Sequence, residues 1–213
     1  MRREIDSIPG REGWTKEALD KMSKVDSFIK ESMRLSSTST CECTYWLSPY
    51  CLFIICPIVS MMRKTLKPFT LSNGTVIPPG VLIFVPGQAR HMDPSIYPTP
   101  DLFDGFRFSN LEKEQQGNDS GPLTANLSST LRGARFKLVT TTPDYLAWGY
   151  GRHACSGRFF AALVLKLMLA HLVSRYDIKF ENLNGGDARP EDVTFGFNRL
   201  PDPHAKLLLR RRR

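Results

Sequence analysis

The stretch that decides the fold is Trp148-Gly149-Tyr150-Gly151-Arg152-His153-Ala154-Cys155-Ser156-Gly157, which an apolar run from Phe159 to Val173 follows directly. Cys155 therefore stands on a short, glycine-rich loop immediately before a predicted helix. The first N–H groups of a helix have no partner within the helix, so they can stabilise a thiolate at its N-terminal end. A lone cysteine is more often a small buried residue, but this placement predicts a thiolate that can hold a metal.

The neighbours of Cys155 support the same interpretation. Arg152, His153 and Arg158 place positive charge near the sulfur, which favours its ionised form. Gly151 and Gly157 carry no side chain at positions where a flat ligand would approach the backbone. A thiolate in such surroundings suits a metal, and a thiolate-ligated haem is one known use.

The loop resembles the haem-ligand loop of the cytochrome P450 family, aromatic-x-x-Gly-x-(Arg or His)-x-Cys-x-Gly. The residues that match this pattern are Trp148, Gly151, His153, Cys155 and Gly157. The run from Gly151 to Ala161 is similar to fungal members in particular. The resemblance implies a mostly helical fold with a small β-sheet. Residues 1–213 would form one partial domain of it, which corresponds to the C-terminal half of the family's fold and is truncated at the N-terminus.

Two further landmarks of that family occur in the same order along the chain. Apolar residues at helical spacing predict an amphipathic helix from an N-cap at Thr15 to about Leu35, and Glu31 and Arg34 face each other on one of its turns. The segment 98–108 resembles the family's Pro-x-x-Phe-x-x-x-Arg-Phe region. By that resemblance, Arg107 joins Glu31 and Arg34 in a buried, structural ion network, in which one carboxylate is shared by two guanidinium groups.

Between these landmarks the sequence predicts two β-features. Asn73-Gly74 lies between two short β-prone runs and is a strong hairpin signal. The run from Val81 to Val85 is uniformly apolar, so we expect a strand covered on both faces inside a sheet.

A dinucleotide-binding module is an alternative interpretation of the cysteine loop. Gly149-x-Gly151-x-x-Ala154 opens a helix, and Glu181 follows the strand-like run from Tyr176 to Phe180. The strand expected before the glycines would have to be the short run from Tyr145 to Trp148.

Residues 37–58 do not fit the family pattern, because the family's Glu-x-x-Arg helix leads within a few residues into the first sheet. We interpret this segment as an insertion or as translated non-coding sequence. Its run of uncharged residues from Tyr45 to Met62 leaves open a non-catalytic, membrane-associated fragment. Four cysteines in this part of the chain are too irregularly spaced to favour a zinc site: Cys41, Cys43, Cys51 and Cys56.

Two other segments are polar. Residues 109–135 show no apolar period and are expected to form an exposed, flexible loop. The net charge of +8 is partly due to a basic tail at residues 207–213, which we expect to be a solvated tail and not a nucleic-acid contact.

The resemblance further implies the activity of a haem-thiolate monooxygenase, which inserts one oxygen atom of O2 into a small organic substrate. Cys155 would be the axial ligand of the iron of haem b, and Arg63 and His153 occupy positions where the family holds the haem propionates. NADPH-cytochrome P450 reductase would be the partner, facing a basic surface around Arg152, Arg158 and Lys166.

The resemblance implies that full-length members lie on the cytosolic face of the endoplasmic reticulum membrane, and we expect these 213 residues to lack the family's N-terminal anchor. The family's oxygen-handling helix is also missing from the 213 residues. We therefore expect this chain to be inactive by itself.

Overall fold

The computed structural model describes residues 1–7, 13–36, 60–117, 134–181, 190, 192–195 and 198–212. Its helical elements are α1 (Arg2–Ser7), α3 (Lys16–Asp20), α4 (Ser23–Leu35), α5 (Gly87–His91), α6 (Arg107–Gly117), the 3₁₀ turn η2 (Gly151–His153) and α8 (Arg158–Arg175). Its strands are β1 (Ser60–Lys64), β2 (Phe69–Thr70), β3 (Val76–Ile77), β4 (Leu82–Val85), β5 (Tyr176–Phe180), β6 (Val193–Phe195), β7 (Asn198–Leu200) and β8 (Leu207–Arg211). The expected mostly helical fold with small sheets is confirmed.

The described strands form four separate antiparallel pairs: β1 with β4, β2 with β3, β5 with β8 and β6 with β7. The run before the glycine loop is a turn held by an isolated bridge between Thr142 and Tyr145, not a strand. A dinucleotide site needs parallel strands joined by a helix. The dinucleotide alternative is therefore wrong for the part of the chain that the structure describes.

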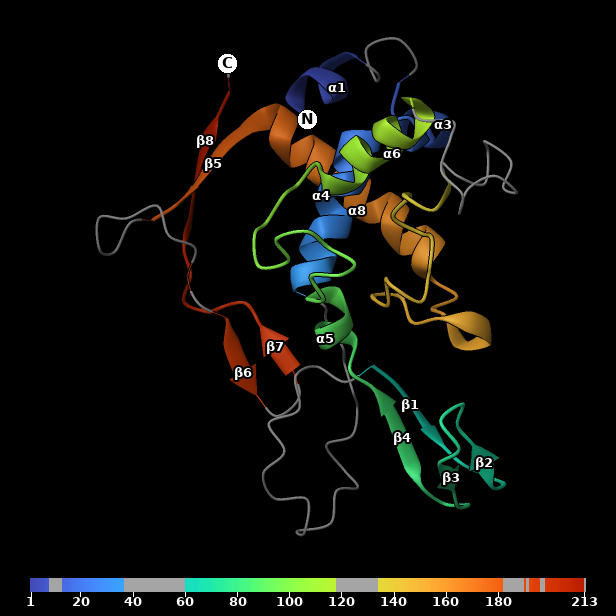
Figure 1. Ribbon diagram of the computed structural model, residues 1–213. Helices are drawn as coiled ribbons and strands as arrows, with labels where there is room; N and C mark the ends of the chain where they lie inside the picture. The colour runs from blue at the N-terminus through green and yellow to red at the C-terminus, as the bar shows by residue number, and fades with distance from the viewer. Residues whose placement is uncertain are drawn as a thin grey trace.

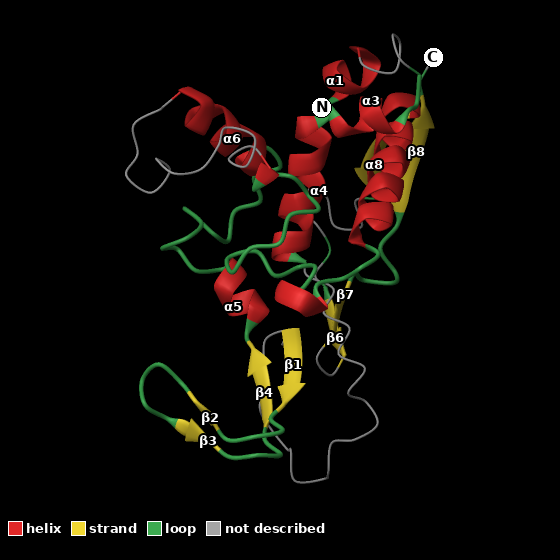
Figure 2. Cartoon of the chain, turned by 90° about the vertical axis from the view of Figure 1, so that its right-hand side faces the viewer, coloured by secondary structure: helices red, strands yellow, loops and turns green. Residues whose placement is uncertain are grey.

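The helices gather at one end of the molecule, and β1 to β4 extend from the other (Figures 1 and 2). Helices α4 and α8 are in contact and run through the centre of the helical part, with α1 and α3 packed on α8. Both termini lie beside α1, on the side away from β2 and β3.

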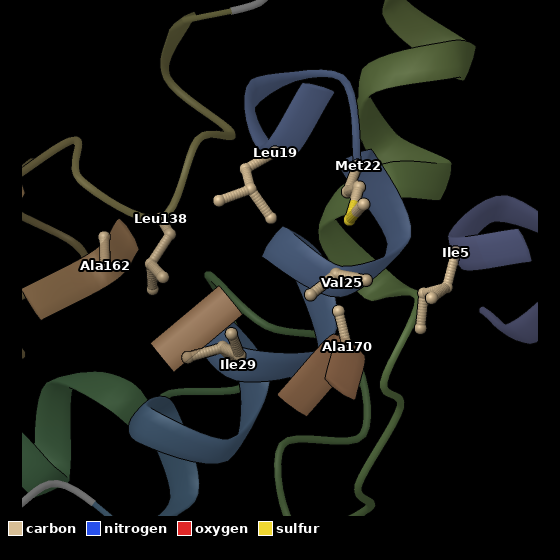
Figure 3. Close-up of a cluster of buried hydrophobic side chains, with 8 residues drawn as sticks. All are labelled: Ile5, Leu19, Met22, Val25, Ile29, Leu138, Ala162 and Ala170. Carbon is tan, nitrogen blue, oxygen red and sulfur yellow. The ribbon is translucent and has the colours of Figure 1, made fainter. Parts of the chain in front are cut away.

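The main core lies between α4 and α8 (Figure 3). Its buried residues come from α1, α3, α4, α8 and the segment before the cysteine loop: Ile5, Leu19, Met22, Val25, Ile29, Leu138, Ala162 and Ala170. The apolar face that the sequence predicts on residues 19–29 is the face that fills this core. The helix spacing thus identifies the packed side correctly.

The predicted single helix from Thr15 to Leu35 is in fact two helices. Thr15 caps α3 as expected, because its hydroxyl accepts a hydrogen bond from the Ala18 N–H (3.2 Å). The chain then turns at Lys21 and Met22 before α4 begins at Ser23. The turn lets Met22 enter the core, where it is fully buried.

The hairpin at Asn73-Gly74 is confirmed, with Phe69 opposite Ile77 and a positive φ of 84° at Gly74. The expectation for the next strand is wrong. Leu82 and Phe84 in β4 are 47% and 41% exposed, because among the described residues β4 pairs only with β1, and its other face, with Ile83 and Val85, is covered only in part.

Both polar segments contain ordered elements. Residues 109–117 continue helix α6 and are not a loop, since Phe108 and Ser109 are buried at its start. Residues 207–211 of the basic tail form strand β8, which pairs with β5 along its length and is exposed to solvent, and Arg210 contacts Asp177 at 3.0 Å. The remainder of the expected loop, residues 118–133, lies outside the described residues.

Helix α8 is less buried than its sequence suggests. A helix that is apolar on almost all sides is usually buried on several of them, but in α8 only Ala162, Lys166 and Ala170 are buried, whereas Phe160 is 74% and Met168 57% exposed. The described part of the chain covers one face of α8 and leaves an apolar face open.

The interpretation of residues 37–58 as an insertion stays a prediction, because it lies outside the described residues, as do the four cysteines there. The membrane interpretation of Tyr45 to Met62 rests almost entirely on the same undescribed residues. Among the described residues, no helix combines the length and apolar character that crossing a membrane requires.

Candidate functional site

The cysteine loop, residues 148–157, is shaped by its own backbone. The Cys155 N–H donates to the Trp148 carbonyl oxygen (2.7 Å), which closes the loop, and η2 forms its middle. Gly149 and Gly151 have φ values of 71° and 70°, a region that side chains disfavour. Glycines at these positions therefore allow the loop to close.

Cys155 presents its side chain to solvent and is a free cysteine. A Cβ built on Gly157 would lie 3.9 Å from the Cys155 Sγ, whereas one built on Gly151 would meet no atom within 4 Å. A side chain at position 157 would therefore come close to the sulfur, and the glycine there keeps that space open. A soft, exposed donor with open space beside it fits a thiolate-ligated metal group.

Arg158, at the start of α8, holds the loop to its surroundings. Its guanidinium donates to the carbonyl oxygens of Cys155 (2.9 Å) and Val139 (3.0 Å) and lies over the Phe159 ring at 4.3 Å. We had expected this charge to favour the thiolate. The observed contacts of Arg158 instead fix the backbone on either side of the sulfur.

Trp148 connects the loop to α4. Its indole N–H donates to the Leu138 carbonyl oxygen (2.9 Å), and the Leu138 N–H donates to Oδ2 of Asp26 (3.0 Å). The Lys166 ammonium lies 2.7 Å from Oδ1 of Asp26, and both side chains are buried. The ring of Trp148 packs against the main core, so this side of the loop is fixed to α4 and α8 together.

The burial of Lys166 corrects one expectation. Lys166 cannot form part of a basic surface for a reductase, because its ammonium is enclosed with Asp26 and also donates to the Leu19 carbonyl oxygen (3.3 Å). The sequence carried a signal for this pair: a single lysine between Ala162 and Ala170 on one face of an apolar helix.

The structure brings Glu31, Arg34 and Arg107 together. Arg34 contacts Glu31 through two N–H groups, Nε to Oε2 at 2.8 Å and Nη2 to Oε1 at 2.9 Å, and Arg107 Nε lies 3.1 Å from Oε1. Glu31 and Arg34 are fully buried and Arg107 nearly so. Burial alone would raise the pKa of Glu31. The hydrogen bonds from Arg34 and from the Asp104 N–H, together with the charges of Arg34 and Arg107, outweigh this effect and hold the pKa of Glu31 below its usual value.

The remaining N–H groups of the two arginines bind backbone carbonyls. Arg34 donates to the carbonyl oxygens of His91 (2.6 Å) and Pro100 (2.8 Å), and Arg107 to those of Pro98 (2.7 Å) and Leu102 (3.0 Å). The ion network therefore holds α4, α5 and the turn before α6 in one arrangement.

Two buried residues near the site were not found from the sequence. The Lys30 ammonium donates to the Arg135 and Lys137 carbonyl oxygens (2.9 and 3.0 Å) and lies over the Phe108 and Tyr145 rings. Burial lowers the pKa of Lys30 to about 7, while Asp26 opposes this shift. The other residue is His91, whose contacts are described below. Neither residue stands in a recognisable motif, since their partners lie far away in the chain.

Arg63 and His153 are both exposed, and neither side chain forms an ion pair among the described residues. Arg63 lies on β1 directly after a bulge, and its Nη1 donates to the Met62 carbonyl oxygen (2.7 Å). Both side chains are therefore accessible to a ligand. Among the described residues, no hydrogen bond links either side chain to Cys155.

The comparisons with known proteins agree with this arrangement. The cytochrome P450 family model matches residues 54–205, a range that includes the cysteine loop, Arg63 and Arg107. A match of this extent establishes membership. The chain belongs to the cytochrome P450 family.

Several fungal relatives align with the whole chain, including the segment with Glu31 and Arg34. Cytochrome P450 monooxygenase 103 of Postia placenta is 37% identical over 215 residues, which cover 100% of this chain and 35% of that protein. Cytochrome P450 monooxygenase trt6 of Aspergillus terreus is 36% identical over 212 residues, with 100% and 36% covered. The chain thus spans little more than a third of the length of these relatives.

Proposed function

We propose that this chain supplies the thiolate side of a haem-thiolate monooxygenase, with Cys155 as the axial ligand of the haem iron. The observation that carries the proposal is the exposed Cys155 side chain on a loop closed by glycines, inside the segment that matches the family. The family's reaction requires a haem, and a free sulfur at this position could bind the haem iron.

The other residues of the site would hold the group in place. Arg63 and His153 would bind the haem propionates, because both are exposed side chains with no competing acidic partner among the described residues. Trp148 fixes the loop from behind through its indole N–H, and Gly151 and Gly157 leave the ligand face free of side chains. When bound, the haem supplies the binding and activation of O2 for insertion of one oxygen atom into a small organic substrate.

The partner that we propose is NADPH-cytochrome P450 reductase. Arg152 is exposed on the cysteine loop, so it offers positive charge to an acidic surface there. Lys166 and Arg158 contribute less than the sequence suggests, because Lys166 is buried and Arg158 is engaged by two carbonyl groups.

We further propose that the 213-residue chain alone does not form a stable, reduced haem thiolate. The Cys155 side chain is exposed, so water would reach the sulfur if it held a haem and could protonate it. We also expect no substrate turnover from the isolated chain.

A titration of ferric haem tests the ligand role. It uses a background in which Cys41, Cys43, Cys51 and Cys56 are serine, with Cys155→Ser in that background as the matched control. We expect the absorption and electron paramagnetic resonance of a thiolate-bound ferric haem, lost in the control. Thiolate-bound haem that persists in the control, or its absence from both proteins, would contradict the ligand role.

The same samples, reduced under carbon monoxide, test the second proposal. We expect the absorbance of the carbon-monoxide adduct of a thiolate haem to be weak or to decay. A stable adduct that depends on Cys155 would overturn the expectation of instability and strengthen the ligand role.

A further inference from the structure

His91 is a buried histidine that none of the proposed chemistry uses. It is the last residue of α5, its side chain is fully buried, and its ring stacks on Tyr145 with the ring centres 5.4 Å apart. Both of its ring nitrogens have partners. Nε2 lies 2.8 Å from the Leu146 N–H nitrogen, and Nδ1 lies 3.2 Å from the Arg34 carbonyl oxygen.

These two partners determine which nitrogen carries the proton. A backbone N–H can only donate, so Nε2 must accept from Leu146 and cannot be protonated. A carbonyl oxygen can only accept, so Nδ1 must carry the hydrogen and donate it to Arg34. The structure therefore requires a neutral imidazole of a single tautomer.

The position of His91 joins two parts of the site. On one side, it exchanges two hydrogen bonds with Arg34, because the His91 carbonyl oxygen also accepts from Arg34 Nη1 (2.6 Å). On the other side, Leu146 lies two residues before Trp148, and its carbonyl oxygen accepts from the Gly149 N–H (2.8 Å). The Trp148 carbonyl in turn binds the Cys155 N–H.

We propose that His91 is a positioning residue, which transmits the placement of the ion network to the entrance of the cysteine loop through its bond to the Leu146 N–H. Its consequence for haem rests on the proposed function, but the positioning itself does not. Among the described residues no hydrogen bond joins Arg34 to Leu146 directly, whereas His91 bonds to both.

Three substitutions separate this role from simple filling of space. His91→Gln can place an amide oxygen near Nε2 and so can still accept from Leu146. His91→Asn can place an amide nitrogen near Nδ1, which keeps the donor to Arg34 but not the acceptor for Leu146. His91→Phe keeps a ring against Tyr145 and removes both hydrogen bonds.

Hydrogen exchange of the haem-free chain is the first measurement. We expect the amides of Leu146, Gly149 and Cys155 to exchange about tenfold faster in His91→Asn and His91→Phe, and near the parent rate in His91→Gln. The amides of α8 serve as the internal reference. Equal acceleration in all three variants, or none in His91→Phe, would overturn the proposal.

Nitrogen NMR of the imidazole in the unsubstituted chain is the second measurement, and it does not depend on whether a variant folds. We expect the tautomer protonated at Nδ1. A proton on Nε2 would overturn the proposal, because that nitrogen could not then accept from Leu146.

A haem titration of the same variants keeps the two proposals distinguishable. If His91 positions the loop and Cys155 binds haem, His91→Asn weakens haem binding about tenfold more than His91→Gln does. If Cys155 does not bind haem, Cys155→Ser leaves the titration unchanged, while the exchange rates at Leu146 still respond to His91.

Discussion

At the scale of single residues, Glu31 holds two guanidinium groups from distant parts of the chain. Arg107 is 76 positions away from Glu31, yet its Nε shares Oε1 with Arg34 and the Asp104 N–H. A buried ion is stable only while its partners are present. The contribution of Glu31 to stability can therefore be measured by removing one member of the network.

We expect Glu31→Gln to lower the free energy of unfolding by about 3–5 kcal/mol, because two buried arginines lose their shared anion. Urea unfolding followed by circular dichroism measures this loss. The matched control is Glu114→Gln on α6, which is exposed and should change stability by less than about 0.5 kcal/mol. Equal effects of the two substitutions would show that the network does not support the fold.

Single residues also show what the sequence reveals about the site. Cys155, Glu31, Arg34 and Arg107 stand in recognisable motifs, so they could be singled out. Lys30 and His91 could not, because their roles depend on carbonyl and N–H groups that only the folded chain brings to them. The sequence signals a backbone partner that lies close by, as for the cap at Thr15, but not one that lies far away in the chain.

At the scale of elements, the contact between α4 and α8 places the cysteine loop. Asp26 on α4 contacts Lys166 on α8, and the same carboxylate accepts from the Leu138 N–H. Ala162 and Ala170 lie on either side of Lys166 and are buried, so the two helices pack closely there. The pair therefore fixes the helix that begins just after Cys155.

A double-mutant cycle tests this pair. We expect Lys166→Met and Asp26→Asn each to lower the free energy of unfolding by about 3–5 kcal/mol, since each strands a buried polar partner. The double variant should lose at least about 1 kcal/mol less than the sum, measured by urea unfolding. Strict additivity would mean that the two side chains do not depend on each other.

Elements whose signals are local could be predicted, and those that depend on distant partners could not. The cap at Thr15, the turn at Asn73-Gly74 and the helix after Gly157 follow from short patterns. The run of four arginines at 210–213 predicts a solvated end, and β8 is exposed, but its pairing with β5 has no local signal. Helix α6 was read as a loop because its first buried residues, not an apolar period, hold it in place.

At the scale of the whole molecule, acid should weaken the fold through His91. Burial lowers the pKa of His91 from 6.5 to about 4. Between these values the unfolded chain binds a proton at His91 that the folded chain does not, so the contribution of His91 to stability is full above pH 6.5 and falls as the pH drops toward 4. The difference amounts to about 3 kcal/mol.

Urea unfolding between pH 4 and 7 measures this dependence. We expect His91→Gln to flatten the slope in that window, whatever its effect on stability at pH 7. The exposed residue His171 provides the control, and His171→Gln should leave the slope of the parent chain unchanged. A parent slope that survives His91→Gln would assign the acid sensitivity to another group.

The distance along the chain between the partners in this site has a consequence for folding. The bonds that shape the approach to the sulfur run from Leu146 back to residue 91 and from Leu138 back to residue 26, across 55 and 112 positions. Closing such long loops is slow, and it comes after local helices have formed. We therefore expect the loop around Cys155 to take its shape only after α4 and α8 have met. If Cys155 binds haem as proposed, that binding should be among the latest events of maturation.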